Sequence, residues 1–316
     1  MIDDPVKKPG FMSSRLCIIF SLLGLFSASP IDAETVAVVY PETREPYQSI
    51  FLSIIEGIEK GGRFPIKEYV LKPNEPVEDI LGWLTQEGIG TLIALGASAL
   101  ELADQLPDTM RPVVGAVLID PDTATRDVMG ITLAADPEVV FERLKNLSPA
   151  TTRVNVVYNP ERNAWLIKRA QEAAQRRGLT LRTFPAKNIR ESALVYREIS
   201  QDVRAQADAI WLLQDDTTLD EQAVLPFILK EAWDRNLVVF SSNPTHVKRG
   251  ALFSLYPDNV GMGRRLATMA TKGASTGKEN IVPLRDLSTA VNLRTADHLG
   301  LDLSSRDRSQ YSLSYP

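Results

Sequence analysis

The chain has 316 residues, of which 44% are hydrophobic and 24% charged, and its formal net charge is −5. This length and apolar content are enough to fill one large core or two of ordinary size. A mildly acidic chain without a stripe of lysine and arginine has no electrostatic footprint for a phosphate backbone, so we expect no nucleic-acid partner.

The N-terminus predicts an exported protein. Leu16 to Ala28 is an uncharged, mostly apolar run after a basic residue, which is typical of a secretory signal peptide, here cleaved after Ala33. The run is too short to span a bilayer comfortably. Cys17 lies at its start, so we expect no lipid anchor and, in a host with an outer membrane, a periplasmic protein. A complete signal also begins at Met12, which leaves the start of translation open.

The rest of the chain repeats itself at a fixed offset. VAVVYPETR at Val36–Arg44 and VNVVYNPER at Val154–Arg162 are identical at five of nine positions, 118 residues apart. The same offset places TLIAL at Thr91–Leu95 on AIWLL at Ala209–Leu213. A third pair, PVVG and LVVF, matches at an offset of 125, which indicates a small insertion in the second half. We therefore predict two similar lobes of roughly 115 residues each.

The first half alternates predicted strands, which are β-branched runs, with helices that place apolar residues every three or four positions. Expected strands are 35–40, 65–71, 91–95 and 113–118, and expected helices are 47–60, 77–86, 97–105 and a helix that Asp136-Pro137 opens. This alternation predicts a parallel sheet covered by helices. Pro149 is the expected crossing into the second lobe.

The second half repeats this alternation. Expected strands are 153–158, 180–184, 209–213, 237–240, 252–256, 281–286 and 289–293, and expected helices are 164–177, 191–205, 220–236, 258–272 and 295–299. We assign 34–148 plus about 257–279 to the first lobe, 149–256 plus about 280–301 to the second, and 302–316 to a mobile tail. The helix capped by Asp258 is expected to pack with the first lobe.

The predicted fold is α/β, with two similar Rossmann-like lobes, parallel sheets and a ligand cleft between the lobes. In such sheets the ligand groups lie on loops beyond the carboxyl ends of the strands. The candidate ligand-binding residues on these loops are Tyr40, Tyr47, Ser98, Asp120, Asn159, Glu161, Asn163, Asp215, Asp216, Ser241 and Asn243.

Catalytic motifs are missing from these loops. GASAL at Gly96–Leu100 lacks the second glycine of a nucleophile elbow, and neither GxGxxG after a strand nor GxxxxGK[ST] occurs. Two histidines without a mature cysteine do not make an ordinary zinc site, and DDTTLDE lacks the spacing of a calcium loop. We expect no catalytic residues, no cofactor and no metal.

The acidic pair Asp215-Asp216 has two interpretations. The carboxylates are favourable beside a helix N-terminus, with Thr218 and Glu221 forming a capping box. An acidic pair after a buried strand also offers an acceptor for a ligand ammonium, and we assign that role to Asp216. Both interpretations stay open, since one carboxylate can cap while the other binds.

Similar alternatives hold for the other loop residues. Asn159, Glu161 and Asn163 are turn residues by default and ligand contacts by position, and Ser98 either caps a helix or helps to hold a ligand carboxylate. Trp211 and Trp233 are expected in the core. The aromatic residues nearer the loops, which could stack on a ligand, are Tyr40, Tyr47, Tyr158 and Trp165.

Several segments resemble the ABC transporter substrate-binding protein family that includes tryptophan- and tyrosine-binding members. They are VVYNPERNAWLIKRAQEAAQRRGL, DAIWLLQDDTTLDEQAVLPFIL, VVFSSNPTHVKRGALFSLYPDNVGMGRRLA and AVNLRTADHLGL. The resemblance implies a type I periplasmic-binding-protein fold, three crossing segments and a small solute between the lobes. It places Asn159, Glu161, Asn163, Asp216 and Asn243 at the ligand. In the first lobe Ala97 stands where the family usually has threonine, and PETREPYQS is not its usual loop.

Three functions remain from the sequence. The first is a monomeric solute-binding subunit of an ABC importer, and the second is a protein of the same fold that reports its ligand to a membrane sensor, a kinase or a diguanylate cyclase. An exported enzyme is third. The ligand is an amino-acid-like or related metabolite whose identity stays open.

Overall fold

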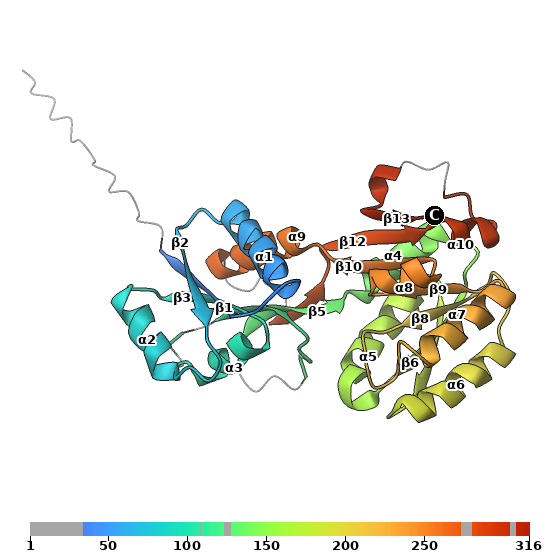
Figure 1. The fold of residues 1–316 in the computed structure, drawn as a ribbon, viewed down its shortest axis with the longest axis horizontal. Coiled ribbons are helices and arrows are strands. Elements are labelled where there is room, and N and C mark those ends of the chain that lie inside the picture. The colour runs from blue at the N-terminus through green and yellow to red at the C-terminus, as the bar shows by residue number, and fades with distance from the viewer. Residues whose placement is uncertain (1–33, 108, 111, 123–127, 273–279, 304–307) are drawn as a thin grey trace, which may run out of the picture. The chain divides into compact units, whose positions relative to one another are not determined.

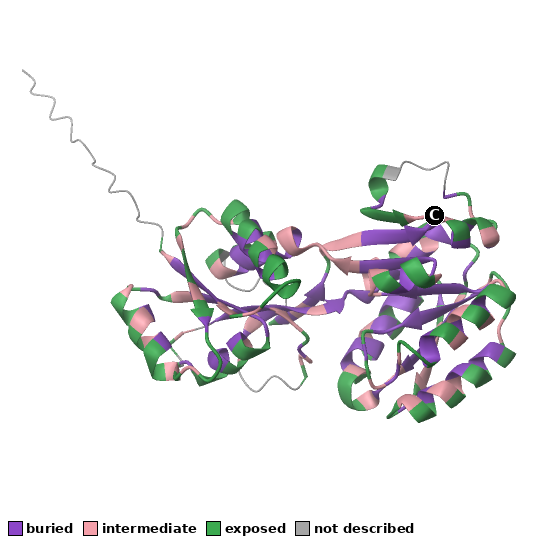
Figure 2. Ribbon diagram, viewed as in Figure 1, coloured by how far each residue is buried: buried purple, intermediate pink, exposed green. Residues whose placement is uncertain are grey.

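A computed structural model describes residues 34–107, 109–110, 112–122, 128–272, 280–303 and 308–316 (Figure 1). The expected signal peptide, Met12 and Cys17 lie outside these residues. Two sheets organise the described chain, and buried residues concentrate along their strands (Figure 2). No helix among the described residues is both long and apolar enough to cross a membrane.

The first sheet has six strands in the order β11-β5-β4-β3-β1-β2, and every neighbouring pair is parallel. Its strands are β1 (Val36–Pro41), β2 (Ile66–Leu71), β3 (Thr91–Leu95), β4 (Val113–Val117), β5 (Met129–Ala135) and β11 (Ile281–Leu284). Its helices are α1 (Tyr47–Gly61), α2 (Val77–Gln86) and α3 (Ala97–Gln105). Successive residues of β1 enter the cores on opposite faces of the sheet, which explains why this strand is apolar throughout.

The second sheet has seven strands in the order β13-β12-β10-β9-β8-β6-β7, with only β10 and β12 antiparallel among its described pairs. Its strands are β6 (Arg153–Tyr158), β7 (Thr180–Pro185), β8 (Asp208–Leu212), β9 (Val238–Ser241), β10 (Phe253–Pro257), β12 (Leu287–Asn292) and β13 (Leu313–Tyr315). The helices that follow its strands are α5 (Pro160–Arg176), α6 (Ile189–Gln201), α7 (Val224–Asp234), α8 (Pro244–Arg249) and α10 (Leu293–His298).

The sequence repeat falls on equivalent strands. β4-β3-β1-β2 in the first sheet and β9-β8-β6-β7 in the second have the same order, and the repeated segments lie on β1 and β6, β3 and β8, and β4 and β9. The predicted fold class, two similar α/β lobes with parallel-dominated sheets, is confirmed.

The two lobes exchange one helix each. After β5 the chain enters α4 (Pro137–Leu147), whose Phe141 packs edge-on against Trp211 of β8 at 5.4 Å between ring centroids. After β10 it enters α9 (Asn259–Lys272), which packs on the first lobe as predicted. The first crossing therefore follows β5 and precedes Pro149, so our assignment of residues 137–147 to the first lobe is wrong. The apolar face of α4 packs into the core of the second lobe. The local sequence shows that this face is buried but not which lobe buries it.

Glycines allow α1 and α9 to pack closely. A Cβ on Gly57 would lie 2.2 Å from the carbonyl oxygen of Val260, and one on Gly263 would lie 2.0 Å from that of Ile54. No side chain larger than hydrogen fits at either position without moving the backbones apart.

The C-terminal part differs from the expectation in two places. β11 pairs with β5 in the first sheet, although residues 280–301 were assigned to the second lobe. The supposedly mobile tail contains a 3-10 turn (Arg308–Gln310) and β13, which pairs with β12, while Leu303 and Tyr311 are buried in the second core. Residues 304–307 lie outside the described residues. Burial of these two apolar side chains outweighs the polar composition of the tail.

Candidate functional site

A pocket of about 330 Å³ lies at the carboxyl ends of strands from both lobes. Loop residues after β4, Ala134 of β5, the first turns of α5 and the loop after β8 line it. The lining residues are Leu118, Ile119, Asp120, Ala134, Glu161, Arg162, Asn163, Trp165, Gln214 and Asp215. Four of the predicted ligand-binding residues therefore meet here, namely Asp120, Glu161, Asn163 and Asp215.

Asp215 is the buried anchor of this pocket, with 1% of its side chain exposed. Its carboxylate accepts hydrogen bonds from the Asn163 amide at 2.8 Å, from the Thr217 backbone N–H at 2.9 Å and from the Thr217 hydroxyl at 2.6 Å. The Asn159 backbone N–H adds a longer bond at 3.4 Å. A carboxylate with this many donors holds the β8 loop against α5.

Asp216 lies differently. Its side chain is 87% exposed, pairs with the Arg162 guanidinium at 2.6 Å and does not line the pocket. The structure therefore does not bring Asp216 to the position expected for a ligand ammonium. Instead it orients Arg162, whose Nη1 also lies 3.9 Å from Asp215. β8 ends at Leu212, three residues before Asp215, and the loop that follows turns Asp215 inward and Asp216 outward.

Asn159 is the N-cap of α5. Its side-chain oxygen accepts from the Glu161 backbone N–H at 3.0 Å, and its amide donates to Thr217 at 3.0 Å. With Pro160 at the first helical position, this cap starts the helix four residues earlier than the sequence indicated. The early start places Glu161 and Asn163 on the pocket wall. Asn159 is 5% exposed and does not line the pocket, but its hydrogen bonds hold this wall in place.

The capping box predicted for Thr218 and Glu221 does not form. The Asp220 carboxylate instead accepts from the Gln222 and Ala223 backbone N–H groups, and α7 begins at Val224. Thr218 bonds weakly to the Asp215 carbonyl at 3.5 Å. Glu221 turns to His246 at 2.7 Å and to Arg249 at 2.8 Å.

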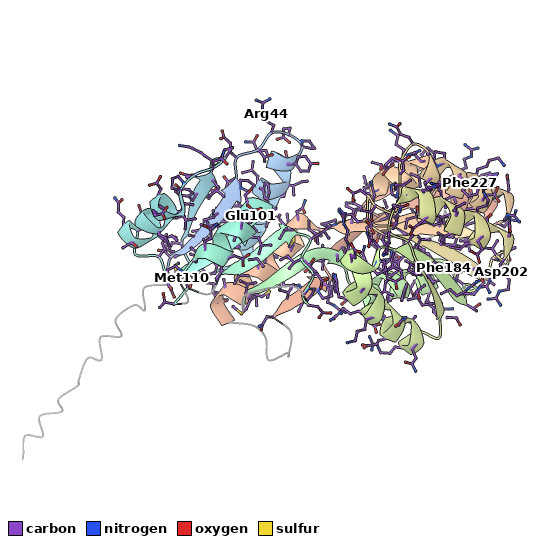
Figure 3. The ribbon with its side chains drawn as sticks, turned by 90° about the horizontal axis from the view of Figure 1, so that it is seen from below. Arg44, Glu101, Met110, Phe184, Asp202 and Phe227 are labelled. Atoms are coloured by element: carbon purple, nitrogen blue, oxygen red, sulfur yellow. The ribbon has the colours of Figure 1, made fainter. Side chains whose placement is uncertain are left out.

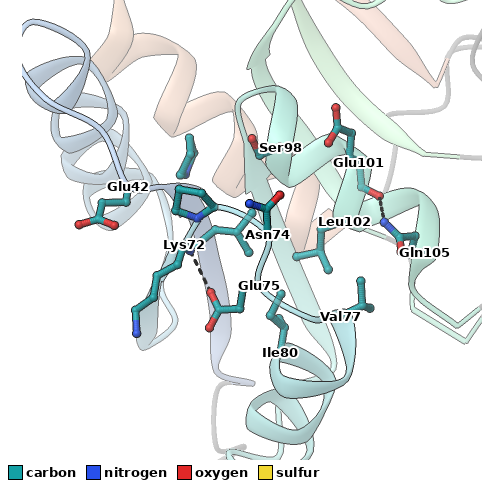
Figure 4. A pocket seen from close by; sticks show the side chains of 13 residues that line it. Glu42, Lys72, Asn74, Glu75, Val77, Ile80, Ser98, Glu101, Leu102 and Gln105 are labelled. Carbon is teal, nitrogen blue, oxygen red and sulfur yellow. Dashed lines mark hydrogen bonds between the residues drawn. The ribbon is translucent and has the colours of Figure 1, made fainter.

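Ser98 lines another pocket, of about 380 Å³, at the carboxyl ends of β1 and β2 (Figure 4). Glu42, Glu75 and Glu101 surround it together with Lys72, and Glu75 already accepts from the Lys72 backbone N–H at 2.9 Å. Gly96 precedes α3 at φ 86°, where only glycine is unstrained, and α3 has no side-chain cap. Capping by Ser98 is therefore not observed.

The predicted tyrosines lie outside both pockets. Tyr40 donates to Glu68 at 2.8 Å and packs beside Phe51, and burial together with this carboxylate raises the pKa of Tyr40 to about 12. Tyr47 is 63% exposed at the start of α1. Arg44, the repeat partner of Arg162, points away from the first lobe (Figure 3).

Ser241 and Asn243 form a separate network at the end of β9. Ser241 Oγ accepts from the Asn243 backbone N–H at 2.8 Å, and Asn243 caps α8 through the Thr245 N–H at 2.9 Å. The Ser241 hydroxyl also contacts Nδ1 of the buried His246 at 2.9 Å. Both residues serve to hold α8 in place, and neither lines the pocket.

Six of the ten lining residues were not among the ligand-binding candidates, and three of them bear on the chemistry of the pocket. Ala134 lies on β5, a strand that was not among those expected, although MGITLAA is an apolar strand-like run. Arg162 appeared only as a repeat position. Trp165, at 8% exposure, adds an aromatic wall.

The pocket has the chemistry of a binding site. Asp120, Glu161 and Asp215 bring three carboxylates against the one cation of Arg162, beside the apolar surface of Leu118, Ile119 and Trp165. The excess of carboxylates favours a ligand with a protonated amine, and the apolar wall favours a nonpolar body. Among the described residues no group of three or more His, Cys, Asp or Glu could hold a metal ion.

Comparisons with protein families and with solved structures identify the chain's relatives. Residues 88–307 match the family described as ABC transporter substrate binding protein. No protein of curated function matches the sequence.

Solved structures share the fold. The ABC domain from Streptococcus pneumonia in complex with L-Trp has 18% identity and a TM-score of 0.53, with 89% of this chain and 99% of that chain covered. A ligand-free, open substrate-binding protein with adhesive properties from Clostridium difficile has 16% identity and a TM-score of 0.62, with 90% of this chain and 99% of that chain covered. The two-lobe architecture and the family match together show that the chain belongs to the ABC transporter substrate-binding protein family, with the type I periplasmic-binding-protein fold.

Proposed function

We propose that this protein captures a small solute with a protonated amine and an apolar body in the pocket at Glu161 and Asp215, and delivers it to an ABC importer. The observation that carries this proposal is the excess of carboxylates beside Trp165 and Ile119. The protein is exported, acts as a monomer and binds its ligand without catalysis. L-Trp, which the streptococcal relative binds, is one solute of this class.

Each residue has a proposed role in this site. Glu161 is exposed on the pocket wall and receives the ammonium group directly. Asp120 adds a second carboxylate from the first lobe. Arg162 receives a ligand carboxylate when one is present, held in place by Asp216. Asp215 and Asn159 keep these groups in position, and Trp165 contacts the apolar body.

A thermal-shift screen tests the proposal, with amino acids, their decarboxylated amines and other small metabolites as ligands. A ligand that binds only the folded protein increases the free energy of unfolding by RT ln(1 + [L]/Kd), and this raises the melting temperature. We expect hits to be amines with apolar bodies. Hits confined to anions, or to uncharged sugars, would contradict the proposed ligand class.

A matched pair of variants tests the site. Glu161→Gln keeps the shape and removes the charge, so it should weaken binding of an amine by at least roughly tenfold in calorimetry. Glu172→Gln on an exposed turn of the same helix should leave the affinity unchanged. Equal affinities in both variants would place the ligand elsewhere.

A further inference from the structure

A basic groove of about 430 Å³ lies in the second lobe and shares no residue with the candidate pocket. It is formed along α7, mostly by its second half, together with the end of α8, the start of α10 and Pro316. Its described lining residues are Pro226, Leu229, Lys230, Trp233, Lys248, Arg249, Gly250, Asn292, Arg294, Thr295 and Pro316. They include four cationic side chains and no acidic one, in a chain whose net charge is −5.

The topology places this groove away from the ligand pocket. α7 returns the chain from the carboxyl end of β8 to the amino end of β9, so its second half lies towards the amino ends of the strands. β12 runs antiparallel to β10, so its last residue, Asn292, lies at that edge as well. An occupant of the groove would therefore not compete with a solute at Glu161.

Two of the four cations are uncompensated. Lys230 pairs with Asp234 at 2.5 Å, and Arg249 pairs with Glu221 at 2.8 Å. Within the described chain, Lys248 and Arg294 are exposed and make no ion pair. Positive charge is thus available for a partner at two separate places along the groove.

Trp233, which lines the same groove, belongs to an aromatic stack. The Trp233 ring stacks on His298 with centroids 3.6 Å apart and planes 6° apart, and His298 Nε2 donates to the Trp233 carbonyl at 2.9 Å. The Arg294 guanidinium lies 5.4 Å from the Trp233 ring centroid. Trp233 was expected in the core, yet it is 37% exposed. A fixed, half-exposed tryptophan beside an arginine is typical of the residues that dominate protein interfaces.

The groove is not built for a small anion. The polar groups of Asn292 and Thr295 are already used, since Asn292 Nδ2 donates to the Val247 carbonyl at 2.8 Å and Thr295 Oγ1 to the Gly250 carbonyl at 3.1 Å. The cations lie on long exposed side chains of three elements, and two of them, Lys230 and Arg249, are already paired with carboxylates. Small-molecule sites instead enclose their ligand with a few precisely placed polar groups.

We propose that this groove docks an acidic segment of a partner protein, with carboxylates on Lys248 and Arg294 and an apolar side chain on Trp233. Complementary charge would speed the encounter and make the affinity fall with salt. Docking here is independent of solute binding, so the partner would engage the protein with or without ligand.

The test measures binding of a fluorescein-labelled acidic peptide, five glutamates with one leucine in the middle, by anisotropy at low and high salt. The double variant Lys248→Glu, Arg294→Glu should weaken binding by at least roughly tenfold. The control Lys187→Glu, Arg190→Glu changes the net charge equally on the exposed start of α6, and should weaken binding much less. In NMR spectra the Trp233 indole N–H resonance, assigned through Trp233→Phe, should shift with the peptide.

Three outcomes would overturn the proposal. They are equal losses in the two double variants, a Trp233 resonance that does not move, and inorganic phosphate that displaces the peptide at submillimolar concentration. The last would indicate a small-anion site. Melting temperatures of all variants establish that each is folded.

Discussion

The two lobes share a strand order but start their helices in different ways. In the first lobe α1, α2 and α3 follow Pro46, Pro76 and Gly96, and none has a side-chain cap. In the second lobe, asparagine caps are the rule, at Asn159, Asn188, Asn243 and Asn292. A side-chain cap fixes the start of a helix through a local hydrogen bond, whereas an uncapped helix depends on its packing.

This difference bears on the candidate pocket. The second-lobe wall is held by the bonds among Asn159, Asn163, Asp215 and Thr217, so it is formed before a ligand arrives. The first lobe adds Leu118, whose side chain is half exposed, with Ile119 and Asp120 from an irregular loop. We infer that the second lobe positions the ligand and the first lobe encloses it.

The largest expected effect is on the helix contact that organises the first lobe. Gly263→Leu should lower the free energy of unfolding by about 3 kcal/mol or more, because the new side chain meets the α1 backbone. Hydrogen exchange should rise in residues 36–117 far more than in 153–241. Gly82→Ala, where a Cβ meets open space in α2, should instead stabilise by about 0.5–1 kcal/mol. A Gly263→Leu protein as stable as the parent would refute the close contact.

The next effect contrasts the two neighbouring carboxylates. Asp215→Asn should cost about 2–3 kcal/mol in urea unfolding, because the new amide faces the Asn163 amide and leaves buried donors without an acceptor. Asp216→Asn removes one exposed pair with Arg162 and should change stability by less than about 0.5 kcal/mol. Similar losses in both variants would show that Asp216 is structural too.

A smaller effect tests the caps themselves. Asn188→Ala should lower stability by about 1 kcal/mol, since it removes the bond from the Glu191 backbone N–H to the Asn188 side chain and breaks the reciprocal bond from Asn188 to Glu191. Gln48→Ala, in the exposed and uncapped first turn of α1, should change it by less than about 0.5 kcal/mol. If Gln48→Ala were the costlier change in urea unfolding, the comparison of the lobes would fail.

The smallest effect concerns alkaline stability of the first lobe. The bond to Glu75 and partial burial raise the pKa of Tyr69 to about 12, above the value of about 10 for an unfolded chain. The native state therefore holds this proton more tightly, and its contribution is complete below pH 10 and lost between pH 10 and 12. We expect less than about 1 kcal/mol for this partly exposed group. Urea unfolding between pH 8.5 and 11 should show a shallower decline in Tyr69→Phe, and identical declines would contradict the assignment.

Local sequence patterns located most of the regular structure. The strand bounds 91–95 and 153–158, and the helix bounds 77–86 and 97–105, agree with β3, β6, α2 and α3. Apolar periodicity and turn residues decide such elements without long-range information. The repeat added the prediction of two similar lobes, and the order that four strands share in the two sheets agrees with it.

The candidate site was only partly accessible from the sequence. Asp120, Glu161, Asn163 and Asp215 meet in one pocket, since the ends of parallel strands share an edge. The same rule also selected Ser241 and Asn243, which hold α8 and His246 instead. Position in a loop does not show whether a polar side chain faces a ligand or its own backbone.

By itself, the sequence determined the α/β alternation, the two-lobe repeat and the edge of each sheet that carries polar loops. Only the tertiary structure decided that α4 and α9 change lobes, that β11 joins the first sheet and that the tail adds β13. It also decided that Asp215 faces inward and Asp216 faces solvent. The physical reason is that periodicity shows which face of an element is buried, whereas the partner that buries it depends on shape, as at Gly57 and Gly263, where two backbones meet.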